Sequence, residues 1–246
     1  PFSTWLMVVL ISGLGFVGYI AMRLLGARAG ILLTSVFGGI ASSTATTLAF
    51  SRRSREDSGL SADYALAVVT ACSVMLPRIL VVVGVLTPAL ATKLVVPFAL
   101  MLVPALLYGT WRLLTRREAA GLVEAPTLTN PLSLVTAIKF ALVYALIAFL
   151  VKAAMSLDLM QSGLLPLSFV SGLTDMDAIA LSMAGAQAAG QLPLDLATKA
   201  VIVGGVGNTV LKAGFAISLG APALRRDVSL VLGATAAIGL ATLWLV

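Results

Sequence analysis

The sequence predicts an all-α, polytopic helical membrane protein. About eight apolar segments form two repeats of four, and the second segment of each repeat is broken or re-entrant. Three observations lead to this fold class. Apolar residues make up 60% of the 246 residues and charged residues only 11%, whereas a soluble domain is nearer half apolar and a quarter charged. The apolar residues gather in segments of bilayer length, and two polar clusters interrupt them at matching positions.

Each of the eight apolar segments is near the roughly 20 residues that an α-helix needs to cross a bilayer. Helix is the expected conformation, because an isolated strand cannot satisfy its backbone groups in lipid. A polar connector at 114–130 divides the chain into a first membrane repeat, 1–113, and a second membrane repeat, 131–246. The segments span residues 4–26, 30–50, 62–87, 91–113, 131–156, 163–189, 195–220 and 228–246.

The two polar clusters are the main evidence for a duplication. One reads GGIASSTATTLA (38–49) and the other SGLTDMDAIALS (171–182). An offset of 133 residues pairs Gly39 with Gly172, Ser42 with Asp175, Thr44 with Asp177 and Leu48 with Leu181. Polar groups inside a membrane are costly and usually functional. The matched clusters therefore predict a site between the two halves of a transporter-like fold.

Basic residues distinguish two topologies, because they favour the cytoplasmic face of a membrane. If all eight segments cross, seven basic residues lie on one face and six on the other. If segments two and six re-enter, the split becomes ten against three, and the repeats are inverted relative to each other. We therefore expect the re-entrant arrangement. Its ten residues are Arg23, Arg28, Arg52, Arg53, Arg55, Arg112, Arg116, Arg117, Arg225 and Arg226, and its three are Lys93, Lys152 and Lys199.

Asp175 and Asp177 are the leading candidates for binding an ion or metal. Residues two apart on an unbroken helix point in different directions, but Gly172 can host a break that turns both carboxylates inward. Hard cations take oxygen ligands from carboxylates, hydroxyls and carbonyls. The first repeat would complete the shell with the hydroxyls of Ser42, Ser43 and Thr44. The alternatives are that the aspartates only cap a helix and that the hydroxyls only bond back to the backbone.

Three basic side chains inside apolar segments, Lys139, Arg78 and Lys212, are the candidate counter-charges. Unpaired buried charge is expensive, so we expect Asp–Lys or Asp–Arg pairs. Asn208 stands four residues before Lys212 and shares its helix face, as a neutral ligand or orienting group. Such pairs either hold helices statically or break and re-form as a cation or proton binds. Helix N-termini at a broken helix also attract anions, so the sign of the substrate stays open.

The histidine, cysteine and charge content of the chain excludes several classes of site and function. The chain has no histidine and a single cysteine, Cys72, which excludes a disulfide framework within one chain or a thiolate metal site. No nucleophile–base motif is present, so we do not expect an enzyme, and no cofactor is predicted. The net charge of +6 is the charge of basic membrane loops and requires no nucleic acid.

Four strings together resemble one family, the uncharacterised C-terminal membrane domain of MgtC/SapB-type bacterial proteins. They are GGIASSTATTLAFSRRSRE (38–56), NPLSLVTAIKFAL (130–142), SGLTDMDAIALSMA (171–184) and NTVLKAG (208–214). The resemblance implies a multi-pass protein of the bacterial cytoplasmic (inner) membrane, with no established substrate or site. Longer members of the family carry an MgtC/SapB domain ahead of this one. Because the chain starts abruptly at Pro1, we expect it to be part of a longer protein.

The favoured function is a membrane transporter or channel for a small ion at the repeat interface. A cation is preferred, and a divalent ion is included. The alternatives are an anion transporter and a non-transporting membrane module that regulates a partner. The expected partners are membrane lipids and a small ion. A homo-oligomer and an MgtC/SapB domain N-terminal to this chain are both compatible with the sequence.

Overall fold

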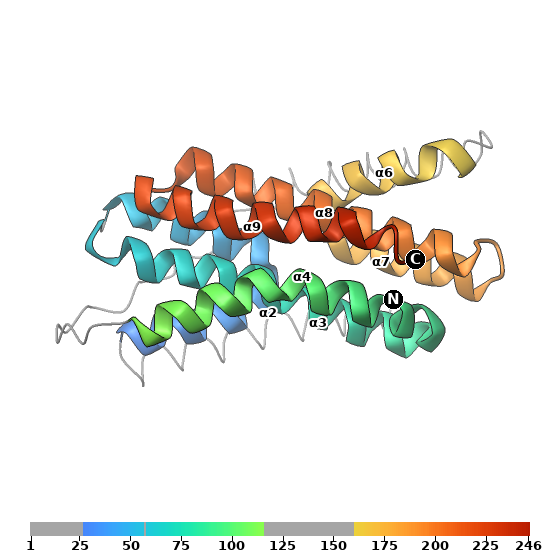
Figure 1. The fold of residues 1–246 in the computed structure, drawn as a ribbon, viewed down its shortest axis with the longest axis horizontal. Helices are drawn as coiled ribbons and strands as arrows, with labels where there is room; N and C mark the ends of the chain where they lie inside the picture. The colour runs from blue at the N-terminus through green and yellow to red at the C-terminus, as the bar shows by residue number, and fades with distance from the viewer. Residues whose placement is uncertain (1–26, 57, 116–159) are drawn as a thin grey trace, which may run out of the picture. The chain divides into compact units, whose positions relative to one another are not determined.

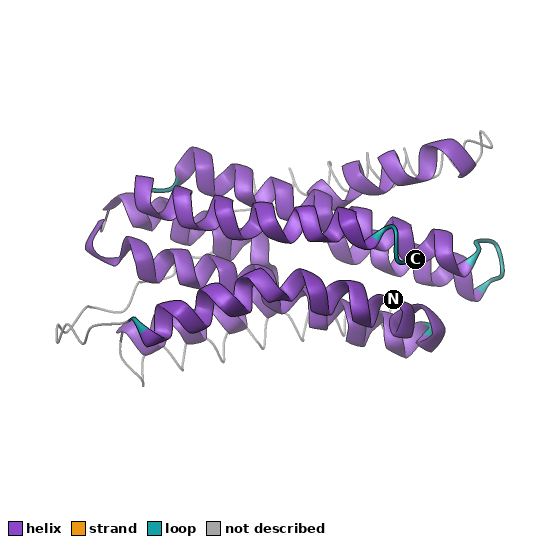
Figure 2. Cartoon of the chain, viewed as in Figure 1, coloured by secondary structure: helices purple, strands orange, loops and turns teal. Residues whose placement is uncertain are grey.

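The structure, a computed structural model, describes residues 27–56, 58–115 and 160–246. Within these ranges every regular element is a helix (Figures 1 and 2), which confirms the all-α prediction for this part of the chain. The elements are α2 (Ala27–Glu56), the short 3-10 helix η1 (Ser58–Leu60), α3 (Ser61–Leu86), α4 (Pro88–Leu114), α6 (Met160–Thr174), α7 (Met176–Ala188), α8 (Leu194–Leu219) and α9 (Pro222–Thr242).

Three stretches of helix are long and apolar enough to cross a membrane: Ser58–Leu86, Pro88–Leu114 and Leu194–Leu219. They correspond to the predicted segments three, four and seven. Segments two and six hold only shorter apolar helices, Ile31–Ile40 and Gly163–Thr174. This shortness follows from the polar clusters, which interrupt both segments near their middle.

Predicted segments one, five and eight have no counterpart among these helices. Segment eight corresponds to α9, which starts earlier than predicted and carries Arg225, Arg226 and Asp227 near its start. It is not among the three long apolar helices. The predicted segments 4–26 and 131–156, and nearly all of the connector 114–130, lie outside the described residues.

The chain divides into two compact units. The described residues of unit 1 fall within Pro1–Met75, Val103–Thr129 and Lys212–Gly233. Those of unit 2 fall within Leu76–Leu102, Asn130–Leu211 and Ala234–Val246. Each of the helices α3, α4, α8 and α9 contributes residues to both units.

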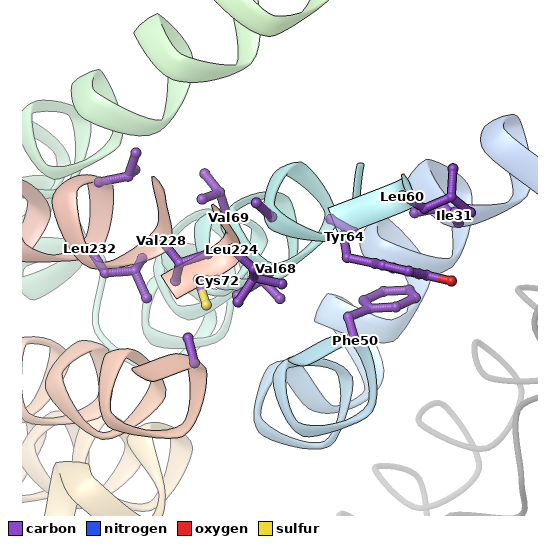
Figure 3. Close-up of a cluster of buried hydrophobic side chains, with 14 residues drawn as sticks. Ile31, Phe50, Leu60, Tyr64, Val68, Val69, Cys72, Leu224, Val228 and Leu232 are labelled. Carbon is purple, nitrogen blue, oxygen red and sulfur yellow. The ribbon is translucent and has the colours of Figure 1, made fainter. Parts of the chain in front are cut away.

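Unit 1 is built around a cluster of buried apolar side chains from α2, η1, α3, α8 and α9. The rings of Phe50 and Tyr64 stack with centroids 5.7 Å apart (Figure 3). Ile31, near the start of α2, and Leu60, in η1 after its end, belong to the same cluster and lie close together in Figure 3. Both ends of α2 therefore contribute to one core.

A polar clamp joins α4 to α9 within unit 1. The hydroxyl of Tyr108 donates a hydrogen bond of 2.9 Å to Oδ2 of Asp227, and a guanidinium nitrogen of Arg112 lies 3.7 Å from the same oxygen. The Asp227 side chain is only 17% exposed. Its charge is therefore held by two groups of α4, and each contact stabilises the pairing of the two helices.

Tyr108→Phe tests this clamp, because it removes the hydroxyl and keeps the ring. We expect the free energy of unfolding to fall by about 1 kcal/mol, the usual net worth of one hydrogen bond. Thermal unfolding of the purified protein in detergent measures the change. An unaltered midpoint would show that the Tyr108 hydroxyl does not stabilise this helix pair.

Candidate functional site

The centre of the candidate site is the break between α6 and α7 in unit 2. Asp175 is the single residue between the two helices, and its backbone is extended, with φ −152° and ψ 114°. Its carboxylate accepts a hydrogen bond of 2.8 Å from the backbone N–H of Asp177, so Asp175 is the N-cap of α7. The predicted break in segment six therefore lies at Asp175. The capping alternative for Asp175 is realised as well, at a break inside an apolar segment.

The sequence predicts a break at Gly172, but this residue stays helical within α6. Its lack of a side chain instead allows close packing against α8. A Cβ atom at Gly172 would overlap the carbonyl oxygen of Gly204 on α8, and one at Gly207 would overlap the carbonyl oxygen of Phe169 on α6. The two backbones therefore touch without intervening side chains. Small residues in the run Gly204-Gly205-Val206-Gly207 thus let α8 pack closely against α6.

Asn208 on α8 caps a backbone carbonyl in the last turn of α6. Its side-chain Nδ2 donates a hydrogen bond of 2.8 Å to the carbonyl oxygen of Gly172. In an unbroken helix that carbonyl would accept from the N–H of Met176, which the break places in a new helix. Asn208 is 3% exposed, so the amide satisfies a helix-end carbonyl that water reaches poorly. The break is thus stabilised on both sides, by Asn208 and by Asp175.

Arg78 on α3 pairs with Asp177, in the first turn of α7. A guanidinium nitrogen lies 2.5 Å from Oδ2 of Asp177, and the two side chains are 21% and 32% exposed. The sequence predicted an Asp–Arg or Asp–Lys pair, and this pair is observed. Two carboxylates and one guanidinium of the described residues therefore lie at the α6–α7 break, and the formal charge of these three groups is negative.

The hydroxyl cluster lies in unit 1, where it forms a second helix irregularity. Ser42 interrupts α2 with φ −163° and ψ 95°, and its Oγ accepts a hydrogen bond of 3.3 Å from the N–H of Ala45. Thr46 and Thr47 donate to the carbonyl oxygens of Ser42 and Ser43. Several hydroxyls thus bond back to their own helix, as the simpler interpretation expects. Ser43 is buried and Thr44 half-buried, and their meeting with the aspartates stays a prediction.

Of the two other candidate counter-charges, the structure describes only Lys212. Lys212 is fully buried in unit 1, where its Nζ donates to the sulfur of Met75 at 3.2 Å. Lys139 lies outside the described residues. Within the described ranges no three His, Cys, Asp or Glu side chains are grouped as a metal site would need. The sequence had not singled out Met75, although the 133-residue offset pairs it with Asn208.

A family model described as a domain of unknown function, DUF4010, matches residues 9–220 of the chain. An uncharacterised protein of Aquifex aeolicus (strain VF5) is 31% identical over 199 residues, which cover 79% of this chain and 84% of that protein. No solved structure matches the chain. The resemblance to MgtC/SapB-type proteins stays a prediction.

Proposed function

The chain belongs to the DUF4010 family, a domain family of unknown function, and from its geometry we propose a membrane transporter or channel for a small cation. The observation that carries the proposal is the α6–α7 break, where Asp175 caps α7 and Asp177 pairs with Arg78. Broken helices with polar groups at their ends are the usual sites of ions in transporters. We place the protein in the bacterial cytoplasmic membrane, as the resemblance to MgtC/SapB-type proteins implies.

The charges at the break favour a cation over an anion. The N-terminus of α7 carries partial positive charge, but the Asp175 carboxylate already caps it. Arg78, the basic side chain that the described residues place at the break, is already paired with Asp177. An incoming anion would have to compete with both carboxylates, whereas a cation would compensate the remaining negative charge.

The core of unit 1 supports a re-entrant second segment. A straight helix from Ile31 to Glu56 would separate its ends by roughly 38 Å, at 1.5 Å per residue. Yet Ile31 shares the apolar cluster with Leu60, which follows the end of α2. A chain that reverses near the irregular residue Ser42 brings these ends together. We infer that segment two returns to the face from which it entered.

Two sets of contacts, one in each unit, support a re-entrant sixth segment. In unit 1, Arg55 after segment two donates to the carbonyl oxygens of Ser218 (2.8 Å) and Gly220 (3.2 Å) at the end of segment seven. In unit 2, Lys93 at the start of α4 lies 3.2 Å from Asp195 at the start of α8. If all segments crossed, an odd number of crossings would separate each pair and put its members on opposite faces. With segment six re-entrant, each pair shares a face.

The positions of the two breaks support the proposed repeat. Ser42 and Asp175, the extended residues within segments two and six, are 133 residues apart. The same offset relates two close helix contacts. A Cβ at Gly39 would lie 2.8 Å from the Cα of Ala71, and one at Gly172 would overlap the backbone of Gly204. Equivalent residues thus break and pack equivalent helices, as inverted repeats of one ancestral unit would.

The topology leads to a labelling prediction in a Cys72→Ala background. Cysteines at Arg28 and Ser58 flank segment two, and cysteines at Ser162 and Gln191 flank segment six. We expect an impermeant thiol reagent to reach both members of each pair from the same face of the membrane. Ser58 and Gln191 are exposed, unlike the fully buried Ser54. Labelling of one pair from opposite faces would show that its segment crosses.

The proposed function is tested by ion flux into liposomes that contain the purified protein. The screen covers sodium, potassium, protons, magnesium, calcium and common anions, with empty liposomes as background. We expect flux of a cation, and at least a tenfold loss in Asp175→Asn with folding intact. The absence of flux for every ion would overturn the proposal and favour a module that regulates a partner, and flux of an anion alone would overturn the choice of a cation.

A further inference from the structure

The geometry points to a monovalent metal cation as the ion bound at the α6–α7 break, with Asp175 and the side-chain oxygen of Asn208 among its ligands. This inference rests on the proposed function and deepens it, because it assigns the charge class of the substrate and a neutral ligand. Three features of unit 2 carry it: the local charge, an unpartnered oxygen, and the way the Asn208 amide is held.

The local charge matches a single positive charge. Arg78 lies 2.5 Å from Asp177, and its single positive charge leaves one of the two carboxylate charges without a basic counterpart among the described residues of the break. A monovalent cation neutralises that charge with the ion pair intact. A divalent cation would leave an excess positive charge in a low-dielectric surrounding unless Arg78 withdrew. The described residues also hold no third acidic group near the pair that could complete a divalent site.

The Oδ1 atom of Asn208 is a buried acceptor that no described donor reaches. The amide orientation is fixed, because only Nδ2 can donate to the carbonyl oxygen of Gly172. Oδ1 therefore lies within roughly 5 Å of that carbonyl, given the N–O separation inside an amide. Gly172 lies in the last turn of α6, directly before the break at Asp175. The Asn208 Oδ1 atom therefore lies near the break.

A buried oxygen without a partner is destabilising, and a metal cation accepts electron density from it as readily as a hydrogen-bond donor does. A proton would need only the carboxylate of Asp175. The neutral amide oxygen therefore favours a metal ion over a proton. Carboxylate, amide and backbone oxygens are hard ligands, which suit alkali cations and exclude soft metals.

Thermal unfolding of the purified protein in detergent tests the inference, because a ligand that binds only the folded state raises the unfolding temperature. The salts are sodium, lithium, potassium and magnesium chlorides, with choline chloride at matched ionic strength as the reference. We expect an alkali cation to raise the midpoint of the wild type above the choline value, and Asp175→Asn and Asn208→Leu to lose this response. Thr209→Val is the matched control on α8, because the Thr209 hydroxyl donates to the carbonyl oxygen of Gly205 on its own helix.

Arg78→Gln keeps the inference falsifiable if Asn208→Leu does not fold. Removing the guanidinium leaves two carboxylates, so we expect the response to shift towards magnesium, while Arg78→Gln combined with Asp177→Asn restores the response to the alkali cation. Stabilisation of the wild type by magnesium but by no alkali cation would overturn the inference and leave a cation transporter standing. Proton flux without any response to alkali cations would overturn it as well. A protein that neither binds nor conducts any ion would overturn the proposed function itself.

Discussion

Gly172→Ala should lower the free energy of unfolding by about 3 kcal/mol, the upper part of the range for overpacking a tight contact. The new methyl group would overlap the carbonyl oxygen of Gly204. Because that neighbour is backbone and not a flexible side chain, α6 and α8 must separate to make room. The separation would also stretch the hydrogen bond from Asn208 to the Gly172 carbonyl. Thermal unfolding in detergent measures the loss, and cation flux should fall with it.

Gly185→Ala is the matched control for this substitution. Gly185 lies in α7, and a Cβ atom there would meet nothing within 4 Å. Alanine should therefore stabilise the helix by about 0.5–1 kcal/mol through its higher helix propensity. If Gly172→Ala proved as harmless as Gly185→Ala, the close approach of α6 to α8 would not exist, and the described break would lose its support from α8.

Removing one partner of the Arg78–Asp177 pair should be the second large effect. A fully exposed pair contributes under about 1 kcal/mol, and breaking a fully buried one costs about 3–5 kcal/mol. These side chains are 21% and 32% exposed, so we expect about 2 kcal/mol for either Arg78→Gln or Asp177→Asn. The double variant should be more stable than the sum of the two losses predicts, because it leaves no unpaired charge.

The double-mutant cycle measures this coupling through unfolding of the four proteins in detergent. A cycle on Lys93 and Asp195 is the control, because that pair is exposed and lies 3.2 Å apart in the same unit. We expect a coupling energy of about 1–2 kcal/mol for the first pair and under about 0.5 kcal/mol for the second. Equal coupling in both cycles would contradict a specific ion pair at the break.

Composition and segment length were sufficient to predict the helical fold. They placed segments three, four and seven within a few residues of α3, α4 and α8, because long apolar runs have one stable conformation in lipid. The short apolar helices end within the two polar clusters, at Ile40 and Thr174. The start of α9 was missed, because Arg225, Arg226 and Asp227 look like a loop in the sequence. In the structure Asp227 is held by Tyr108 of α4, a tertiary contact that no local pattern contains.

Part of the site could be predicted from the sequence, and the rest depends on contacts between helices. Asp175, Asp177 and Arg78 stood out because charge in an apolar segment is unusual, and the structure brings these three together. The roles of Gly172 and Asn208 could not be read from the sequence. Gly172 leaves room for the backbone of Gly204 on α8, and Asn208 donates to the carbonyl oxygen of Gly172. Both roles depend on which helix lies opposite, which segment patterns do not contain.

The proposed transport depends on a cation that binds through the carboxylate of Asp175 at the α6–α7 break. The most direct test compares initial rates of cation flux in liposomes for the wild type, Asp175→Asn and Asp195→Asn. The control makes the same chemical change in unit 2, at a side chain that is 63% exposed and paired with Lys93. We expect Asp175→Asn to lower the initial rate at least tenfold and Asp195→Asn to retain it. Equal flux in all three proteins would contradict this role of Asp175.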